Sequence, residues 1–274
     1  MDRRPDFPTF TQAFFVCVAL IVIQVIVTVI YMGFGGKFNA GNPAAVGIVS
    51  TISALILFSF LLPYKGLSVA ALFHSGPSSV HSVLVLLTLP IVLVAFGTGV
   101  MVLNILSVLL YLLPMSQGQV EMFSELSGGG WVTVVIFVLM APLIEETLFR
   151  GIFLRAFLRQ YKPRTAIFLA SLLFAVCHLN VYQFVTAMII GTLFGWLYVR
   201  THSLVPCYVG HAAYNGTCLI VGGLARYLGG DGAAANTYVL PVSLQLLGLA
   251  SLVGGGMMLA KLLLPARSGY EAAE

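Results

Sequence analysis

Charged residues are scarce in this sequence. Of its 274 residues, 13 are lysine or arginine and 9 are aspartate or glutamate, so charged residues make up 8% of the chain. A soluble domain carries about 25%. Hydrophobic residues account for 59%, a balance that excludes a soluble enzyme, a disordered chain and a coiled coil. The net charge of +4 is small and scattered, which excludes a nucleic-acid-binding surface.

Cysteines are also few, and their positions exclude a disulfide framework. All four lie inside apolar stretches and no CxxC pair occurs among Cys17, Cys177, Cys207 and Cys218. We interpret them as buried small hydrophobic residues, and neither as disulfides nor as metal ligands.

Long apolar runs are abundant. A run of about 20 apolar residues is long enough to cross a bilayer as a helix, and Gly, Pro, Asn or charged residues separate the runs. The sequence therefore predicts an all-α, polytopic membrane protein that forms a single membrane domain over residues 1–274 in a lipid bilayer. About eight transmembrane helices are expected, at residues 10–32, 44–63, 82–113, 131–160, 163–178, 183–200, 203–222 and 239–264.

Basic residues set the expected topology, because cytoplasmic loops retain Lys and Arg. With eight helices and a cytoplasmic N-terminus, the other side of the membrane holds only Lys37 and Arg226. The N- and C-termini are therefore both predicted to be cytoplasmic. The cytoplasmic side then holds Arg3, Arg4, Lys65, Arg150, Arg155, Arg159, Lys162, Arg164, Arg200, Lys261 and Arg267.

Two of the predicted helices are too long for a simple crossing. Residues 82–113 would extend for about 48 Å and contain Pro90, so a kinked or tilted helix is expected. The second half of residues 131–160 reads RGIFLRAFLRQ, with arginines between apolar residues. This pattern predicts that the helix leaves the membrane as an amphipathic continuation with its basic face near lipid headgroups.

Three charged residues enter the predicted helical interior: Glu145, Glu146 and Arg150. A charge inside a membrane helix is costly unless it is paired, protonated or in contact with water. Arg150 follows Glu146 by one helical turn and can pair with it, which leaves Glu145 as the free carboxylate. An ion pair that only fixes helix packing would explain Glu146 and Arg150, but it would not explain the second glutamate.

Two histidines lie within apolar helices, His178 and His211, and Asn215 follows His211 by one turn on the same face. If residues 131–160 and 163–178 form an antiparallel hairpin centred near 161.5, Glu145 and His178 lie at equal height and can face each other. We therefore expect the glutamate pair, both histidines and Asn215 to form one site. The other histidines, His74, His81 and His202, are interpreted as solvated or interfacial.

This set of residues supports two chemistries. A carboxylate that faces an imidazole can take a proton from water, while the second histidine and an amide donate to the oxyanion of a tetrahedral intermediate. Alternatively, Glu145, His178 and His211 could hold zinc with an open position. The spacing does not separate the two schemes, so no cofactor is assigned and zinc stays an alternative. The sequence has no HExxH motif, no GxSG motif and no aspartate within a predicted helix, which disfavours the corresponding proteases.

Three ordered motifs resemble those of the CPBP family, which comprises the type II CAAX prenyl endopeptidases and the bacterial ABI-type membrane proteins. They are Glu145-Glu146-x-x-x-Arg150, Phe174-x-x-x-His178 and His211-x-x-x-Asn215. The resemblance extends from about Ala141 to Gly216. It implies a catalytic core at 131–222, in which Glu145 and His178 activate water, His211 and Asn215 stabilise the oxyanion, and Glu146 and Arg150 hold the site. Phe174 would be a packing or substrate-wall residue. Members of this family have been described both as metalloproteases and as glutamate-dependent proteases.

The resemblance thus implies an intramembrane endopeptidase that cuts a membrane-associated protein or peptide near the cytoplasmic face. The chain is similar to the shorter prokaryotic members, which implies the plasma (inner) membrane of a prokaryote. Two other functions are compatible with the residues. One is a non-catalytic membrane-binding or self-protection module, as in bacteriocin immunity. The other is a transporter that uses the Glu and His groups as a proton relay, although no inverted repeat is found.

Overall fold

A computed structural model describes residues 7–65, 68–128, 130–229 and 240–264, and within these residues the protein is helical with no β-strand. The eight predicted helical regions are all present. One of them, residues 130–157, is a continuous rod of several helical types. The other seven are α1 (Phe10–Gly33), α2 (Pro43–Lys65), α4 (Val80–Leu112), α9 (Pro163–Val176), α10 (Val181–Thr201), α11 (Leu204–Gly229) and α12 (Val242–Leu263).

The helix ends agree with the predicted ranges to within a few residues, except that α11 extends to Gly229. Some sequence-based assignments fall outside the described residues. These are the predicted start of the last helix at residue 239, the arginines at positions 3, 4 and 267, and all the aspartates.

Six of the described helices are long and apolar enough to cross a membrane: α1, α2, α4, the 130–157 rod, α10 and α12. α9 is apolar but has only 14 residues. α11 is long enough, but it carries His211 and Asn215 within its apolar sequence. The protein is therefore a polytopic all-α membrane protein.

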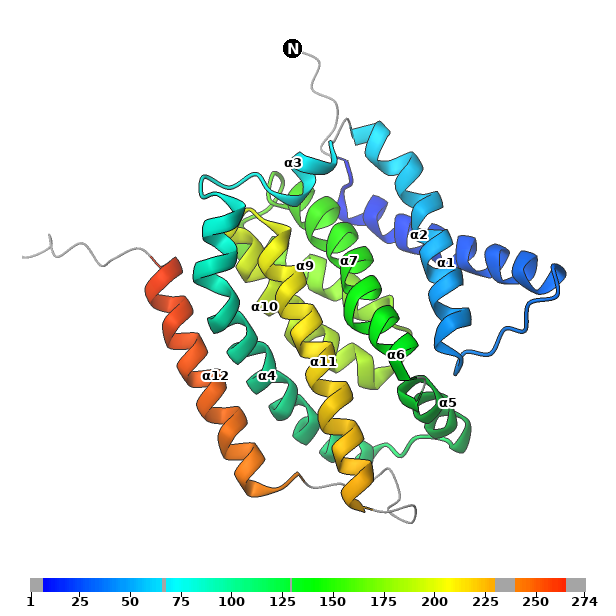
Figure 1. Ribbon diagram of the computed structural model, residues 1–274. Helices are drawn as coiled ribbons and strands as arrows, with labels where there is room; N and C mark the ends of the chain where they lie inside the picture. Colours follow the sequence, from blue (N-terminus) through cyan, green and yellow to red (C-terminus); the bar gives the residue numbers. More distant parts are fainter. Residues whose placement is uncertain (1–6, 66–67, 129, 230–239, 265–274) are drawn as a thin grey trace, which may run out of the picture.

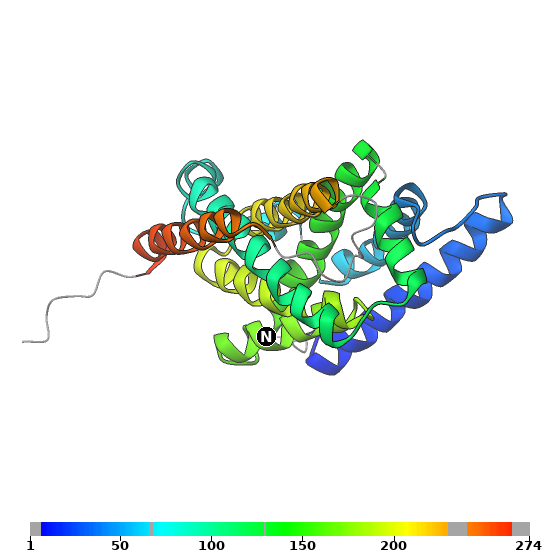
Figure 2. The ribbon, with the colours of Figure 1, turned by 90° about the horizontal axis from the view of Figure 1, so that it is seen from below.

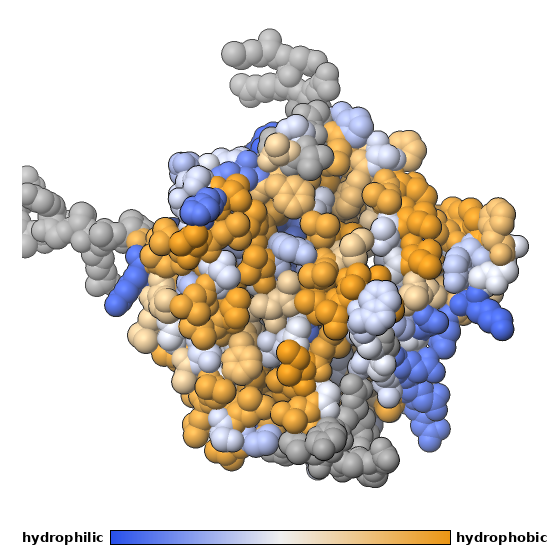
Figure 3. All heavy atoms as spheres, in the orientation of Figure 1, coloured by the Kyte–Doolittle hydropathy of each residue, from blue (hydrophilic) through white to orange (hydrophobic). Residues whose placement is uncertain are grey.

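The helices form a bundle with an apolar exterior. α4 packs against α11 and α12, and α9 pairs with α10. α4 and α11 run in the same direction, and α12 returns beside α4 (Figure 1). α1 contacts α2 and α9 at the edge of the bundle, and its far end projects beyond the other helices (Figures 1 and 2). Apolar side chains dominate the face over α4, α11 and α12, whereas hydrophilic ones gather over α5, Gln117–Gly128 (Figure 3).

Two short helices were not predicted, α3 (Val69–Phe73) and α5. The segment after α3 is tied to the turn between α10 and α11, because the backbone N–H of Ser75 donates to the His202 carbonyl at 3.0 Å. His202 adopts a left-handed conformation with φ of 47° and ends α10. Both short helices lack the long apolar run on which the prediction rested.

α4 remains one helix of 33 residues with Pro90 inside it. Glycines let it approach α12 closely: a Cβ atom at Gly97 would lie 2.4 Å from the Gly248 carbonyl oxygen. A Cβ atom at Gly255 of α12 would lie 2.8 Å from the Pro90 carbonyl oxygen. The α4–α12 contact is therefore made backbone against backbone.

The rod at residues 130–157 corrects one prediction. It comprises α6 (Gly130–Thr133), the π-helix η1 (Val134–Met140), α7 (Ala141–Glu146), the π-helix η2 (Thr147–Leu154) and α8 (Arg155–Phe157). Every residue of η2 is buried, including Arg150. Residues 150–154, the first half of the RGIFLRAFLRQ segment, are therefore enclosed by the protein, where η2 packs against α9, α10 and α11. In the second half Arg155 is half-buried and Arg159 is exposed, so a basic face at lipid headgroups stays a prediction for residues 155–160.

Candidate active site

A proline sets the local structure in front of the glutamate pair. Pro142 has no N–H, and its ring would collide with the carbonyl of residue 138 in a regular α-helix. The turn before it is widened into the π-helix η1, where the N–H of Ala141 bonds to the carbonyl of Ile136, five residues back. An α-helix would have used the carbonyl of Phe137. The π-helix therefore leaves the Phe137 carbonyl available to another partner.

Glu146 and Arg150 form a buried ion pair. The Arg150 guanidinium donates from Nη1 to Glu146 Oε1 at 2.8 Å, and both side chains are at most 2% exposed. Nη2 of the same guanidinium donates to the carbonyl of Gly191 on α10 at 3.2 Å. The aromatic rings of Phe174 and Phe194 lie 4.7 and 5.9 Å from the Arg150 guanidinium carbon. Such burial is tolerated because the charge is paired and hydrogen-bonded.

His211 joins this ion pair from α11. Its Nδ1 lies 2.8 Å from Glu146 Oε1, so one carboxylate oxygen accepts from both His211 and Arg150. The other oxygen, Oε2, is buried without a hydrogen-bond partner among the described residues. Because Nδ1 is engaged by Glu146, the second nitrogen of the imidazole, Nε2, is the one left for chemistry.

Glu145 lies on the other side of His211. Its Oε2 is 3.6 Å from His211 Nε2, and its side chain is 29% exposed, against 1% for Glu146. The two adjacent glutamates thus contact the two nitrogens of one imidazole.

Phe174 and His178 lie at the end of α9. His178 comes two residues after the helix end, and its Nδ1 is 2.8 Å from the Phe174 carbonyl. Leu179 then takes a left-handed conformation with φ of 56°, and Asn180 caps α10 by accepting from the Gln183 N–H. The Phe174 ring meets His178 edge-on, with centroids 4.9 Å apart. The expected turn after residue 178 is therefore present, and it presents the Nε2 side of His178 for other contacts.

Asn215 connects α11 to the widened helix. Its Nδ2 donates to the freed Phe137 carbonyl at 2.7 Å. A side-chain amide nitrogen carries two hydrogens, so one remains for another acceptor. The predicted polar stripe of α11 therefore has two anchor points, His211 at Glu146 and Asn215 at the π-helix.

The described side chains do not form a ready metal site. Within the part of the chain that the structure describes, no group of three His, Cys, Asp or Glu side chains could hold a metal ion. The alternative zinc set, Glu145, His178 and His211, would need all three donors about 2 Å from one ion. Glu146 and the Phe174 carbonyl engage only Nδ1 of His211 and of His178, which leaves both Nε2 atoms free, as in many zinc-bound histidines. The three donors are nevertheless not gathered around one point among the described residues.

Sequence reasoning missed two parts of the cluster, Phe194 and the backbone carbonyl groups of Phe137 and Gly191. Phe194 is one of several phenylalanines in apolar helices, and nothing in its spacing marks it. A Cβ atom at Gly191 would lie 3.0 Å from Ser171 Cβ, so this glycine lets α10 approach α9 closely. Carbonyl acceptors carry no signal in the sequence at all.

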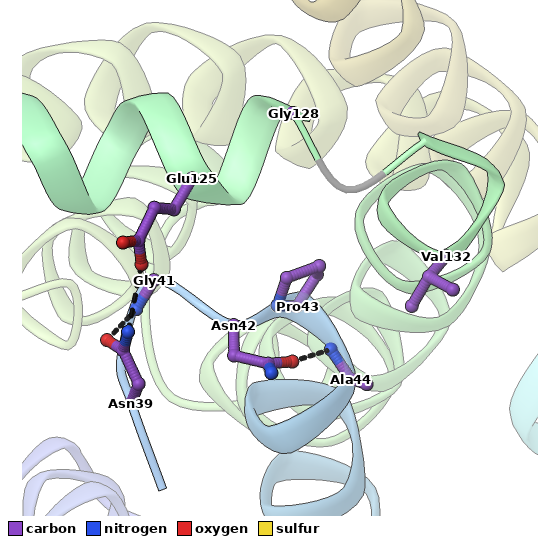
Figure 4. A pocket seen from close by; sticks show the side chains of 8 residues that line it. All are labelled: Asn39, Gly41, Asn42, Pro43, Ala44, Glu125, Gly128 and Val132. Carbon is purple, nitrogen blue, oxygen red and sulfur yellow. Dashed lines mark hydrogen bonds between the residues drawn. The ribbon is translucent and has the colours of Figure 1, made fainter.

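A separate pocket lies far from this cluster (Figure 4). It is lined by the loop before α2, by Glu125 on α5 and by Val132, which is 13 positions from Glu145, about 20 Å along a helix. Asn39 donates to Glu125 at 2.9 Å, and Asn42 accepts from the N–H of Ala44 at 2.9 Å. These contacts tie the α1–α2 loop to α5 and cap α2, so they are structural.

Comparison with known proteins shows that the part of the chain that holds the cluster is similar to one family. Residues 127–217 match the family model described as type II CAAX prenyl endopeptidase Rce1-like. The chain carries an Rce1-like domain. This domain covers about a third of the chain, from the last turn of α5 into α11. It includes all seven predicted site residues, so the resemblance inferred from the three motifs is confirmed.

No curated protein and no solved structure matched the chain. The similarity of residues 127–217 to the Rce1-like family therefore rests on the family match alone. Its membrane setting agrees with the apolar helices around it. The protein is an integral membrane protein, and its residues 127–217 are similar to the type II CAAX prenyl endopeptidases of the Rce1-like family.

Proposed function

We propose that this protein is an intramembrane endopeptidase that hydrolyses a peptide bond of a membrane-associated protein or peptide near the cytoplasmic face. The support is the chain of contacts Arg150–Glu146–His211–Glu145 inside an Rce1-like domain. Only Glu145, at one end of this chain, has a substantially exposed side chain. An ion pair with a purely structural role would not need that exposed carboxylate.

Water binds between Glu145 and His211 in this proposal. Glu145 Oε2 and His211 Nε2 are 3.6 Å apart, so one water can lie about 2.8 Å from both atoms. The cluster contains two carboxylates and the Arg150 cation, so its formal charges sum to zero when His211 carries a second proton. Neutrality matters here because an uncompensated charge is costly in a membrane interior.

The reaction then proceeds without a covalent intermediate. Glu145 takes a proton from the water, and the resulting hydroxide bonds to the carbonyl carbon of the scissile peptide. The Nε2–H of protonated His211 donates to the oxyanion that forms. The C–N bond breaks as Glu145 passes its proton to the leaving nitrogen. The products are a carboxylic acid and an amine.

His178 and Asn215 complete the proposed site. With Nδ1 of His178 at the Phe174 carbonyl, its Nε2 is left to accept a hydrogen bond from the same water. Asn215 has one N–H on Phe137 and one left for the oxyanion. Glu146 and Arg150 do not touch the substrate in this scheme; they hold the His211 ring.

The topology of the helices determines the side of the membrane from which a substrate reaches the site. We propose that the helix ends nearest His202 and Lys162 are cytoplasmic, as the basic residues predict, and that the membrane is the plasma membrane of a prokaryote. A membrane-associated substrate would then reach Glu145 from the cytoplasmic leaflet. The family description names CAAX prenyl endopeptidases, so a prenylated C-terminal peptide is the first substrate to test.

The experiment is a cleavage assay with the full-length protein in proteoliposomes. The probe is a farnesylated peptide that ends in a CAAX tetrapeptide, and the same peptide without the lipid is run beside it. We expect Glu145→Gln and His178→Ala to lower the cleavage rate by about 100-fold or more. The matched controls are Glu121→Gln on α5 and His81→Ala on α4, both at exposed positions, and these should cleave at the wild-type rate.

Two outcomes would overturn the proposal. One is cleavage at the wild-type rate by folded Glu145→Gln and His178→Ala proteins. The other is the absence of cleavage of both probes and of the host's membrane proteome by the wild-type protein. That second result would favour the self-protection module or the transporter, which require no peptide hydrolysis.

Metal removal tests the mechanism separately. Because no three of the described His, Cys, Asp or Glu side chains are placed to hold a metal ion, we expect cleavage to persist after exhaustive chelation, with no stoichiometric metal found by elemental analysis. Loss of activity on chelation, restored by zinc alone, would show that the residues rearrange around an ion and that the direct scheme is wrong.

A further inference from the structure

The imidazole of His211 is held on three sides. Glu146 engages Nδ1 at 2.8 Å. The ring of Phe194 stacks on its face, with centroids 5.5 Å apart and planes 28° apart. The ring of Phe174 meets it edge-on, with centroids 5.9 Å apart and planes 80° apart. A hydrogen bond to one nitrogen leaves the ring free to swing about that bond, whereas a stacked neighbour fixes its plane.

Phe194 also lies against the positive end of the ion pair. Its ring and that of Phe174 both contact the Arg150 guanidinium, which favours the charge electrostatically and keeps water away from it. Phe194 is completely buried. It therefore cannot touch a substrate, and any effect that it has on the reaction must act through His211 or Arg150.

Contacts with α11 fix the position of Phe194. The carbonyl of Phe194 accepts a hydrogen bond from the Cys207 thiol at 3.2 Å. Gly210, the residue just before His211, leaves room for the ring: a Cβ atom there would lie 2.7 Å from Phe194 Cε1. Real Cβ atoms do not approach so closely, so a side chain at position 210 would push the ring off His211. Phe194, Gly210 and His211 thus form one packing unit between α10 and α11.

We infer that Phe194 is a positioning residue for the proposed hydrolysis, and that it sets the plane of the His211 ring so that Nε2 faces Glu145. The inference rests on the proposed function, because orientation of Nε2 matters only if that nitrogen meets the water and the oxyanion. Glu146 selects which nitrogen points inward, and Phe194 selects the direction in which the other one points.

Kinetics with the farnesylated CAAX peptide test this role. We expect Phe194→Leu to lower kcat about 10-fold with little change in KM, because the ring stacking that fixes the plane of His211 is lost at a residue that does not touch the substrate. Phe194→Tyr keeps the ring and should recover most of the rate. Gly210→Ala displaces the ring without altering it and should resemble Phe194→Leu.

The matched control is Phe157→Leu. Phe157 is also completely buried, but its ring contacts are to Phe10, Phe153 and Tyr161, none of which belongs to the cluster. The Phe157→Leu protein should keep a kcat near that of the wild type, although its loss of thermal stability should be similar to that of Phe194→Leu. Equal falls in kcat for Phe157→Leu and Phe194→Leu, or a change confined to KM, would overturn the inference.

A second measurement does not depend on activity. In protein with ¹⁵N-labelled histidine, the His211 signals are identified by their loss in His211→Gln. We expect a sharp Nδ1–H signal in the wild type and a broadened or shifted one in Phe194→Leu, with Phe157→Leu unchanged. An unaltered His211 signal in Phe194→Leu would overturn the inference. Failure of the proposed function would show separately, as a wild-type protein that cleaves no substrate.

Discussion

α1 and the Ala141–Phe157 segment show opposite relations between polarity and burial. α1 has no charged residue, yet only Ala13, Cys17 and Val27 are buried among its 24 residues. The Ala141–Phe157 segment contains two glutamates and two arginines, and all of η2 within it is buried. In a bilayer the lipid accepts apolar side chains at no cost, so polar groups are the ones that must be enclosed.

This contrast separates the helices that face lipid from the segment that carries the candidate site. The enclosed segment lies in the Rce1-like domain, whereas α1 and α12 lie outside residues 127–217. Large side chains on α1 and α12, such as Phe15 and Met257, are more than half exposed. Substitutions should therefore lose effect in a definite order, from the charge cluster, through helix packing outside the domain, to the lipid-facing surface.

The largest loss of stability is expected from Arg150→Met. It leaves Glu146 buried opposite His211 without its guanidinium partner, and breaking a buried pair in this way costs about 3–5 kcal/mol. The apparent Tm of the protein in detergent and the fraction recovered as a monodisperse species measure this loss. Arg159→Met, at an exposed arginine that follows α8, is the control and should be close to the wild type.

The double variant Glu146→Gln with Arg150→Met sharpens that result. It removes both charges, so it should recover much of the lost stability while cleavage stays low, because His211 has lost its carboxylate partner. If Arg150→Met alone proved as stable as the control, the cluster would not be the enclosed charge centre that the contrast with α1 requires.

The sequence predicted the helices well because the determinants of a membrane helix are local. The run from Phe10 to Met32 has no charge, and Pro163 begins α9 where the sequence placed a helix start. The three motifs likewise identified the residues that the structure brings together at Glu146, Arg150 and His211. Those assignments needed only composition, turn residues and motif order.

What the sequence did not predict is a departure from regular α-helical geometry. The alignment of Glu145 with His178 across the hairpin stays a prediction, and it assumed a regular rise per residue. The structure has two π-helical segments on either side of Glu145 and Glu146, and these rotate the face that follows them. Pro142 indicates that the helix is irregular at this point, but the proline alone does not give the extent of the π-helical segment. Hydropathy also cannot tell a lipid-facing side from a protein-facing one, so the sequence placed residues 150–160 together at the headgroups, although residues 150–154 are buried in the protein.

An intermediate effect is expected from Gly97→Ala, in the contact between α4 and α12. The new Cβ atom would lie 2.4 Å from a backbone oxygen of α12, so the helices must separate, and such overpacking costs about 1–3 kcal/mol. Tm should fall, while the cleavage rate of the folded protein stays near the wild type. Gly254→Ala, where no heavy atom lies within 4 Å of the added Cβ, is the matched control on α12. A loss of cleavage as large as that of Glu145→Gln would show that α12 takes part in the chemistry.

The smallest effect is expected from Phe15→Ala on α1. The ring is 63% exposed, so in the membrane it contacts mainly lipid and its removal takes away few contacts within the protein. The free energy of unfolding should therefore change by less than about 0.5 kcal/mol. The same substitution at Phe157, which is completely buried, should cost about 3–5 kcal/mol. Apparent Tm values of the two variants in the same detergent make the comparison. A large loss at Phe15 would mean that a second protein or a substrate, and not lipid alone, covers that face of α1.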